Sequence, residues 1–175
     1  RVFDAFTLEN TLSLIGHESE VHDVRFLPPP DSGLISAGRD GTVRRWKLGP
    51  SAQRPMVLRG HTHLVHALAI ALGGRFVVTG SWDKTIRLFG LDDGIEVGRM
   101  EAGTFVQAIA ISPDERTIAT REYGGDIRLF DVATRTQIAL LDRKPFTLDQ
   151  PLFTADSNRV LVDFDPAART ATFWD

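Results

Sequence analysis

Residue types that form catalytic triads occur near the start of the chain: His17, Ser36 and Asp40. In such enzymes a Ser oxygen attacks the substrate, a His removes its proton and an Asp orients the His. Nearly the same set, with Thr in place of Ser, returns further along: His61, Thr79 and Asp83. The sequence has no Gly-x-Ser-x-Gly elbow, and an enzyme does not need one constellation twice. We therefore expect both sets to be structural, with no catalytic residue among them.

Histidine spacing also raises the question of a metal site. His61, His63 and His66 lie within six residues, and imidazole is a common zinc ligand. Around a junction of loop and strand, however, side chains at spacings of two and five residues point in different directions. The sequence has no Cys to supply a thiolate. We expect neither a bound metal nor a cofactor.

A repeated unit positions these residues. The stretch 58–91 holds a Gly-His pair, an alternating apolar run, a Gly-Gly turn, a second apolar run, a turn with Asp83 and a third run. The same order returns along the chain, and an aromatic residue closes each unit at a spacing of 41 to 44 residues. These aromatic residues are Phe3, Trp46, Phe89, Phe130 and Trp174. An internal repeat of this period indicates a repeat architecture.

At these landmarks the sequence resembles the WD-repeat (WD40) family of β-propellers, whose units run about 40 to 45 residues between a Gly-His and a Trp-Asp. The resemblance implies an all-β fold of four-stranded antiparallel blades, about three complete and one split across the termini. We expect one partial-propeller domain over 1–175, a fragment of a larger propeller. Its expected parts are 1–15 as the end of a preceding blade, 16–59, 60–101 and 102–142 as blades, and 143–175 as an incomplete blade.

Apolar periodicity and turn residues place the strands within these units. In 21–26, Val24 and Phe26 fall on one face at a period of two, and three prolines then end the run. The expected strands are 1–4, 11–15, 21–26, 34–36, 43–46, 54–58, 65–72, 76–79, 85–89, 95–100, 106–111, 117–120, 126–130, 137–141, 152–153, 158–164 and 170–174. The last unit lacks a fourth strand, so we expect that 11–15 completes it, in this chain or in a neighbour.

The resemblance also implies a buried hydrogen-bond network in each blade, made by the His, a Ser or Thr, the turn Asp and the Trp. In the first complete unit these residues are His17, Ser36, Asp40 and Trp46. The second unit has His61, Thr79 and Asp83, but Phe89 replaces the Trp and has no donor. The third keeps only Thr120. A buried indole or imidazole N–H needs an acceptor, which the Ser and Asp oxygens supply.

The surface loops hold the remaining candidates for a binding site. In a propeller, the loops that precede each inner strand and those between the second and third strands lie on one face. On this chain they hold Glu20, His22, Arg39, Leu64, His66, Trp82, Phe105, Gln107 and Tyr123. Exposed aromatic residues with an Arg are typical of interaction hot spots. The alternative is that Trp82 and Phe105 pack inward against adjacent blades.

Composition narrows the partner classes. The chain of 175 residues has a net charge of −3, and no basic cluster favours nucleic acid or an anionic membrane. No apolar run reaches the roughly 18 residues that span a bilayer. We therefore expect a cytoplasmic, non-catalytic scaffold for protein–protein interaction in signalling or assembly, which binds a protein or peptide on the loop face. The alternatives are a sensor domain that regulates an attached kinase, protease or nucleotide-driven switch, a propeller enzyme, and a homodimer that closes the ring.

Overall fold

The described part of the chain is built from β-strands. The computed structural model describes residues 1–3, 7, 10–31, 33–49, 54–141, 150–165 and 170–174, and no helix occurs among them. The strands are β1 (Val2–Phe3), β2 (Asn10–Leu12), β3 (Val21–Phe26), β4 (Gly33–Gly38), β5 (Val43–Lys47), β6 (Met56–Leu58), β7 (Val65–Ile70), β8 (Phe76–Ser81), β9 (Thr85–Gly90), β10 (Glu96–Glu101), β11 (Val106–Ile111), β12 (Thr117–Glu122), β13 (Ile127–Asp131), β14 (Gln137–Leu141), β15 (Leu152–Phe153), β16 (Val160–Asp165) and β17 (Thr170–Trp174).

Consecutive strands pair in antiparallel sheets. Three sheets have four strands each, namely β3–β6, β7–β10 and β11–β14, while β15–β17 form a three-stranded sheet and β1–β2 a two-stranded one. Tight turns allow this order. Between β4 and β5, for example, Gly41 has a φ of 74°, a conformation that favours glycine. The expected all-β fold of four-stranded antiparallel sheets is confirmed.

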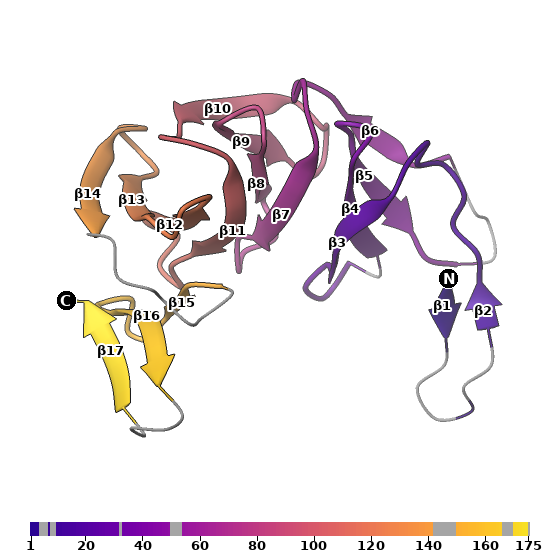
Figure 1. The fold of residues 1–175 in the computed structure, drawn as a ribbon. Helices are drawn as coiled ribbons and strands as arrows, with labels where there is room; N and C mark the ends of the chain where they lie inside the picture. Colours follow the sequence, from indigo (N-terminus) through magenta and orange to yellow (C-terminus); the bar gives the residue numbers. More distant parts are fainter. Residues whose placement is uncertain are drawn as a thin grey trace.

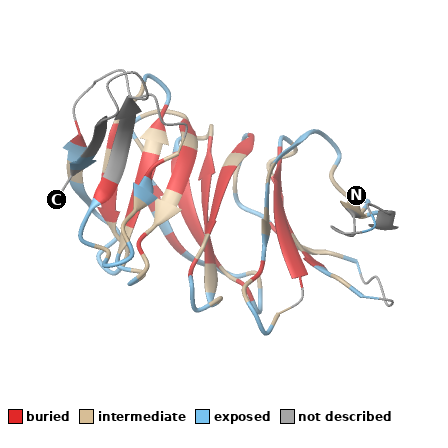
Figure 2. Ribbon diagram, turned by 90° about the horizontal axis from the view of Figure 1, so that it is seen from below, coloured by how far each residue is buried: buried red, intermediate tan, exposed pale blue. Residues whose placement is uncertain are grey.

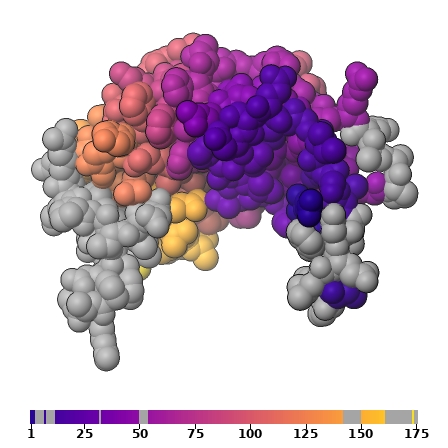
Figure 3. Space-filling model, turned by 45° about the vertical axis from the view of Figure 1, so that its right-hand side comes forward, coloured from indigo at the N-terminus to yellow at the C-terminus, as the bar shows by residue number. Residues whose placement is uncertain are grey.

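The sheets follow one another along an arc (Figure 1). The N-terminus and the C-terminus lie at the two ends of this arc, and the described residues form one continuous body between them (Figure 3). The first strands of neighbouring four-stranded sheets lie next to each other, because β7 contacts both β3 and β11. This is the arrangement of part of a propeller.

The hydrophobic core lies between successive sheets. One cluster joins β3–β6 to β7–β10 through fully buried side chains such as Ile35, Val65 and Phe89, and a second joins β7–β10 to β11–β14. Figure 2 shows these buried residues in the strands of the three sheets. The sheets approach closely, since a Cβ on Gly80 would lie only 2.4 Å from Val106 Cγ1. Each sheet therefore depends on its neighbours for burial.

The first complete sheet has one open face. Val24 on β3 is 45% exposed, whereas the equivalent Leu68 on β7 and Ile109 on β11 are 0% exposed. Phe26, two residues further along, is 67% exposed. Among the described residues no complete sheet covers this face as β3–β6 covers β7. The open face thus exposes the apolar pattern that the other two sheets bury.

Most strands begin or end one to three residues away from the expected bounds; the strand expected over 11–15, for example, spans Asn10–Leu12. The strand expected over 65–72 ends at Ile70, because Gly74 N–H donates to Ala71 O at 2.8 Å and closes a turn there. β2 pairs with β1, so 11–15 does not complete the last sheet within this chain. The proposed boundaries of the individual blades remain predictions.

Candidate functional site

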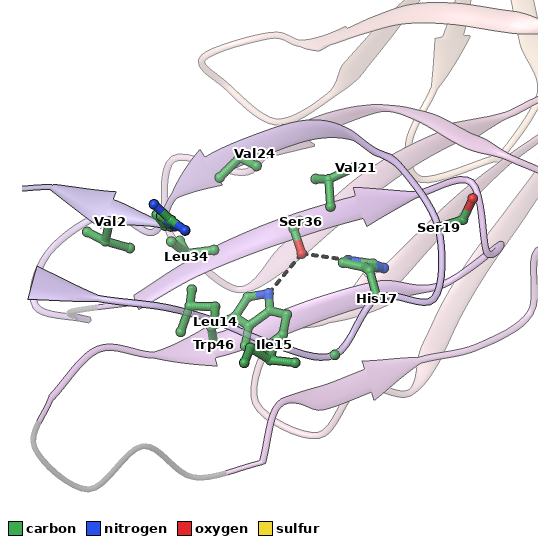
Figure 4. A pocket seen from close by; sticks show the side chains of 12 residues that line it. Val2, Leu14, Ile15, His17, Ser19, Val21, Val24, Leu34, Ser36 and Trp46 are labelled. Carbon is green, nitrogen blue, oxygen red and sulfur yellow. Dashed lines mark hydrogen bonds between the residues drawn. The ribbon is translucent and has the colours of Figure 1, made fainter. Parts of the chain in front are cut away.

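A buried hydrogen-bond network crosses the first complete sheet. Trp46 Nε1–H donates to Ser36 Oγ at 2.8 Å, and Ser36 Oγ lies 2.8 Å from His17 Nε2 (Figure 4). His17 Nδ1 lies 2.9 Å from Asp40 Oδ2. An ionised carboxylate only accepts, so Nδ1 carries the proton. The Ser hydroxyl then accepts from the indole and donates to Nε2.

Asp40 is the main acceptor of this network. Besides His17 it accepts from the Glu18 N–H at 3.0 Å, from the Thr42 N–H at 3.0 Å and from the Thr42 hydroxyl at 2.7 Å. Burial raises the pKa of Asp40, but the hydrogen bonds from Thr42, Glu18 and His17 outweigh it and hold this pKa well below its usual range. The carboxylate is therefore ionised at neutral pH.

The second sheet repeats the network without the indole. His61 Nε2 lies 2.7 Å from Thr79 Oγ1, and His61 Nδ1 lies 2.8 Å from Asp83 Oδ2. Asp83 only accepts, so Nδ1 carries the proton and the Thr79 hydroxyl donates to Nε2; Arg87 O lies 3.2 Å from the same oxygen, as the alternative acceptor of its one proton. Although burial raises the pKa of Asp83, hydrogen bonds from His61 and Thr85 lower it well below its usual range. The network ends at the hydroxyl because Phe89 has no donor.

In the third sheet, different residues occupy the buried positions of the hydrogen-bond network. Thr120 is fully buried, and its hydroxyl has no partner among the described residues. The Glu122 carboxylate, also 0% exposed, accepts the Thr104 N–H at 2.8 Å and lies 3.1 Å from Arg128 Nε. That ion pair lacks the alignment of a hydrogen bond. Glu122 was not among the residues expected from the sequence; the signal for it was Arg128, which stands at the same position in the repeat as Arg44 and Arg87.

The triad residue types are thus bound into the sheet. Ser36 is 3% exposed, and its oxygen is engaged by both Trp46 and His17. A pocket of about 410 Å³ lies beside them on the open face, lined largely by aliphatic side chains such as Leu14 and Val24 (Figure 4). In the second sheet the equivalent Thr79 is 0% exposed. Geometry therefore favours a structural role for these residues.

A recurring backbone bond holds the loops of each sheet on one face. In each sheet, the residue that follows the second strand donates its backbone N–H to the carbonyl oxygen of the residue directly before the first strand. The three bonds are Arg39 N to Glu20 O at 2.8 Å, Trp82 N to Leu64 O at 3.0 Å, and Tyr123 N to Phe105 O at 2.8 Å. We call this side of the molecule the loop face.

Aromatic rings run across the loop face from one sheet to the next. The ring centroids are 5.3 Å apart for His22 and His66, 6.2 Å for His66 and Trp82, 5.4 Å for Trp82 and Phe105, and 6.1 Å for Phe105 and Tyr123. We call these five residues the aromatic tract. Because it crosses three sheets, it offers one continuous surface.

Exposure varies along this face. Tyr123 is 63% exposed, and the exposed Arg39 and Glu20 form an ion pair at 3.5 Å. Trp82 is half-buried, and its Nε1 is buried without a partner among the described residues. Leu64 is only 5% exposed, so its side chain offers a partner little area. The surface is therefore narrower than we expected from the sequence.

The three clustered histidines diverge. His61 belongs to the buried network, His63 stacks on Trp82 at 5.9 Å, and His66 Nδ1 lies 2.7 Å from Gln107 O. Burial and the neighbouring His66, whose ring centre lies 5.3 Å away, lower the pKa of His22. Within the described ranges, no group of three or more His, Cys, Asp or Glu side chains is arranged to hold a metal ion.

The described residues also contain no helix that is long and apolar enough to cross a membrane.

Comparison with known proteins agrees with the repeat. A model of the family "WD domain, G-beta repeat" matches residues 8–47 and 53–90. The small ribosomal subunit protein RACK1 of Dictyostelium discoideum is 38% identical over 88 residues, which cover 47% of this chain and 27% of that protein. The nuclear distribution protein PAC1-2 of Uncinocarpus reesii (strain UAMH 1704) is 37% identical over 90 residues, which cover 47% of this chain and 19% of that protein.

The matches thus span less than a third of the length of either relative. The two stretches matched by the family model fall on the two sheets whose His, hydroxyl and Asp side chains form complete networks. Taken with the antiparallel four-stranded sheets along an arc, the matches show that residues 8–47 and 53–90 of the chain are WD repeats, the units of WD-type β-propellers.

Proposed function

We propose that the chain is a non-catalytic interaction module that binds a protein or peptide on its loop face. The observation that supports this most is the aromatic tract, a run of ring contacts across three sheets that ends in the 63% exposed Tyr123. Aromatic side chains supply contact area at a small cost in conformational entropy, and they are enriched at interaction hot spots.

Polar groups border the tract and would orient a partner. Arg39 and Glu20 present an exposed ion pair at one end, and Lys84 Nζ lies 5.8 Å from the centre of the Phe105 ring. Charged groups at the rim of an interface act mainly on specificity and on the rate of association. An interaction role also agrees with the name of one relative, a small ribosomal subunit protein, which is a component of a larger assembly.

Selection from a displayed library of random peptides against the purified chain tests this proposal. The best peptide is then titrated against the unchanged chain, Tyr123→Ala and a control, Ile138→Ala. Ile138 is 56% exposed on β14, away from the loop face. We expect Tyr123→Ala to weaken binding at least tenfold, since truncating a hot-spot residue costs about 2 kcal/mol or more. Equal affinities for all three chains would refute the loop face as the binding surface.

A further inference from the structure

Two histidines from neighbouring sheets meet on the loop face. His22 is the second residue of β3 and His66 is the second residue of β7, so the repeat places them at equivalent positions. Their ring centroids are 5.3 Å apart, and the ring planes are inclined by 31°. Neither residue belongs to the buried hydrogen-bond networks of His17 and His61.

The hydrogen bond of His66 fixes which ring nitrogen is free. Its Nδ1 lies 2.7 Å from Gln107 O, a backbone carbonyl that can only accept, so Nδ1 carries the proton. Nε2 therefore keeps its lone pair, and no side chain or backbone group of the described residues bonds to it. Stacking against Trp82, at 6.2 Å and 11°, holds the ring in this orientation. Histidines that bind metals almost always donate their other ring N–H in this way, often to a backbone carbonyl.

The ring separation matches a shared metal ion. With a Zn–N distance of about 2.0 Å and a ring radius of roughly 1.2 Å, each ring centre lies about 3.2 Å from the metal, so a tetrahedral angle puts the two centres about 5.2 Å apart. A square-planar angle of about 90° would require a shorter separation of about 4.5 Å. The observed separation of the ring centres, 5.3 Å, leaves room for a zinc ion in tetrahedral geometry between the two rings.

Space and charge around the pair suit a hydrated cation. A pocket of about 220 Å³ is lined by both histidines, Asp23 and Arg25, enough for several waters of about 30 Å³ each. Arg25 forms an ion pair with Asp23 at 3.1 Å, which offsets its positive charge. On the other side Glu20 is paired with Arg39. No unpaired cation among these groups opposes a metal ion.

We propose that His22 and His66 together bind a zinc ion where the first and second sheets meet on the loop face. Two imidazoles fill half of a tetrahedral shell, so water, or a side chain of a bound partner, completes it. The ion would tie β3 to β7. It would also give the loop face an open coordination position.

Isothermal titration of zinc chloride into the purified chain, from which all affinity tags have been removed, tests this inference. We expect one equivalent to bind with micromolar affinity and to raise the melting temperature, because a ligand that binds only the folded state stabilises it. His22→Ala, which removes an exposed ring, should lose at least tenfold in affinity and the increase in melting temperature. The matched control is His63→Ala, which removes another exposed imidazole from the same face.

Three results would overturn the inference: millimolar binding only, equal affinity in His22→Ala, or an equal loss in His63→Ala. The last result would move the site to another set of histidines. The zinc titration contains no protein or peptide partner. A negative result therefore says nothing about partner binding on the loop face, which the peptide selection tests separately. Failure of the peptide selection, in turn, leaves the zinc titration unaffected.

Discussion

Two threonines at equivalent positions should respond in opposite ways to the same substitution. Thr79 on β8 and Thr120 on β12 are both 0% exposed, and valine has nearly the same shape as threonine. The hydroxyl of Thr79 bonds His61 Nε2 at 2.7 Å, whereas that of Thr120 has no partner among the described residues. Substitution by valine therefore removes a hydrogen-bonded hydroxyl at Thr79 and a hydroxyl without a partner at Thr120.

The expected change in the free energy of unfolding depends on which buried polar group each substitution leaves without a partner. In Thr79→Val the ring of His61, whose side chain is 1% exposed, loses its Nε2 partner. Leaving a buried polar atom unsatisfied costs about 1 to 3 kcal/mol. In Thr120→Val a buried hydroxyl without a partner is replaced by a methyl group, which removes a desolvation cost of about 1 kcal/mol or more. We expect Thr79→Val to be about 1 to 2 kcal/mol less stable than the unchanged chain, and Thr120→Val to be equally stable or about 1 kcal/mol more stable.

Thermal and urea denaturation of the three chains measure this difference. A separation of about 1 to 3 kcal/mol between the variants corresponds to melting temperatures roughly 2 to 12 °C apart for a chain of this size. Circular dichroism should show that both variants keep the β-sheet spectrum. Equal destabilisation of the two variants would refute the argument, because it would mean that the His61 bond adds nothing beyond the local fit of threonine.

Three further predictions concern the networks and the open face. Asp40→Ala should lower the free energy of unfolding by about 3 kcal/mol, since two or more buried donors lose their acceptor. Because the folded-state pKa of Asp40 is depressed, this loss should be complete above about pH 4 and should shrink as the pH falls. Urea titrations at a series of pH values measure it. Glu122→Ala should cost about 3 to 5 kcal/mol by chemical denaturation, because it leaves the guanidinium of Arg128 without its buried partner; no loss would contradict the ion pair. Phe26→Ala should cost less than about 1 kcal/mol while Ile109→Ala costs about 2 to 5, since only the second side chain is buried; equal costs would show that something covers the open face.

Much of the fold could be predicted because the repeat places the same local signals in successive units. Alternating apolar residues and the turn at Asp40-Gly41 placed the strands to within a few residues. The strand 65–72 was expected two residues too long, because the apolar pattern continues into a turn that only the hydrogen bond of Gly74 reveals. Two interpretations of 11–15 were open, an outer strand beside 1–4 and a strand that completes the last sheet. The strand signal could not decide between these two edges, and β2 pairs with β1.

The site was less predictable, for a physical reason. Residue types identified the donors and acceptors around His17 and His61, but Glu122 stands at a position where the other sheets have Gly38 and Ser81. Its role depends on an arginine that reaches it across the sheet. The meeting of His22 with His66 likewise depends on how two sheets pack, which no spacing within one strand encodes. Burial of Leu64 is a third case, because a loop residue can turn inward.

Hydrogen–deuterium exchange of the chain with its selected peptide tests the central claim most directly. We expect slower exchange in 18–23, 38–42, 61–66, 81–85, 102–107 and 122–125, the segments that form the loop face. Exchange should be unchanged in turns at the opposite end of the sheets, 28–31, 72–75 and 91–95. Protection confined to those opposite turns, or to the open face around Val24 and Phe26, would contradict the proposal that the chain binds its partners through the loop face.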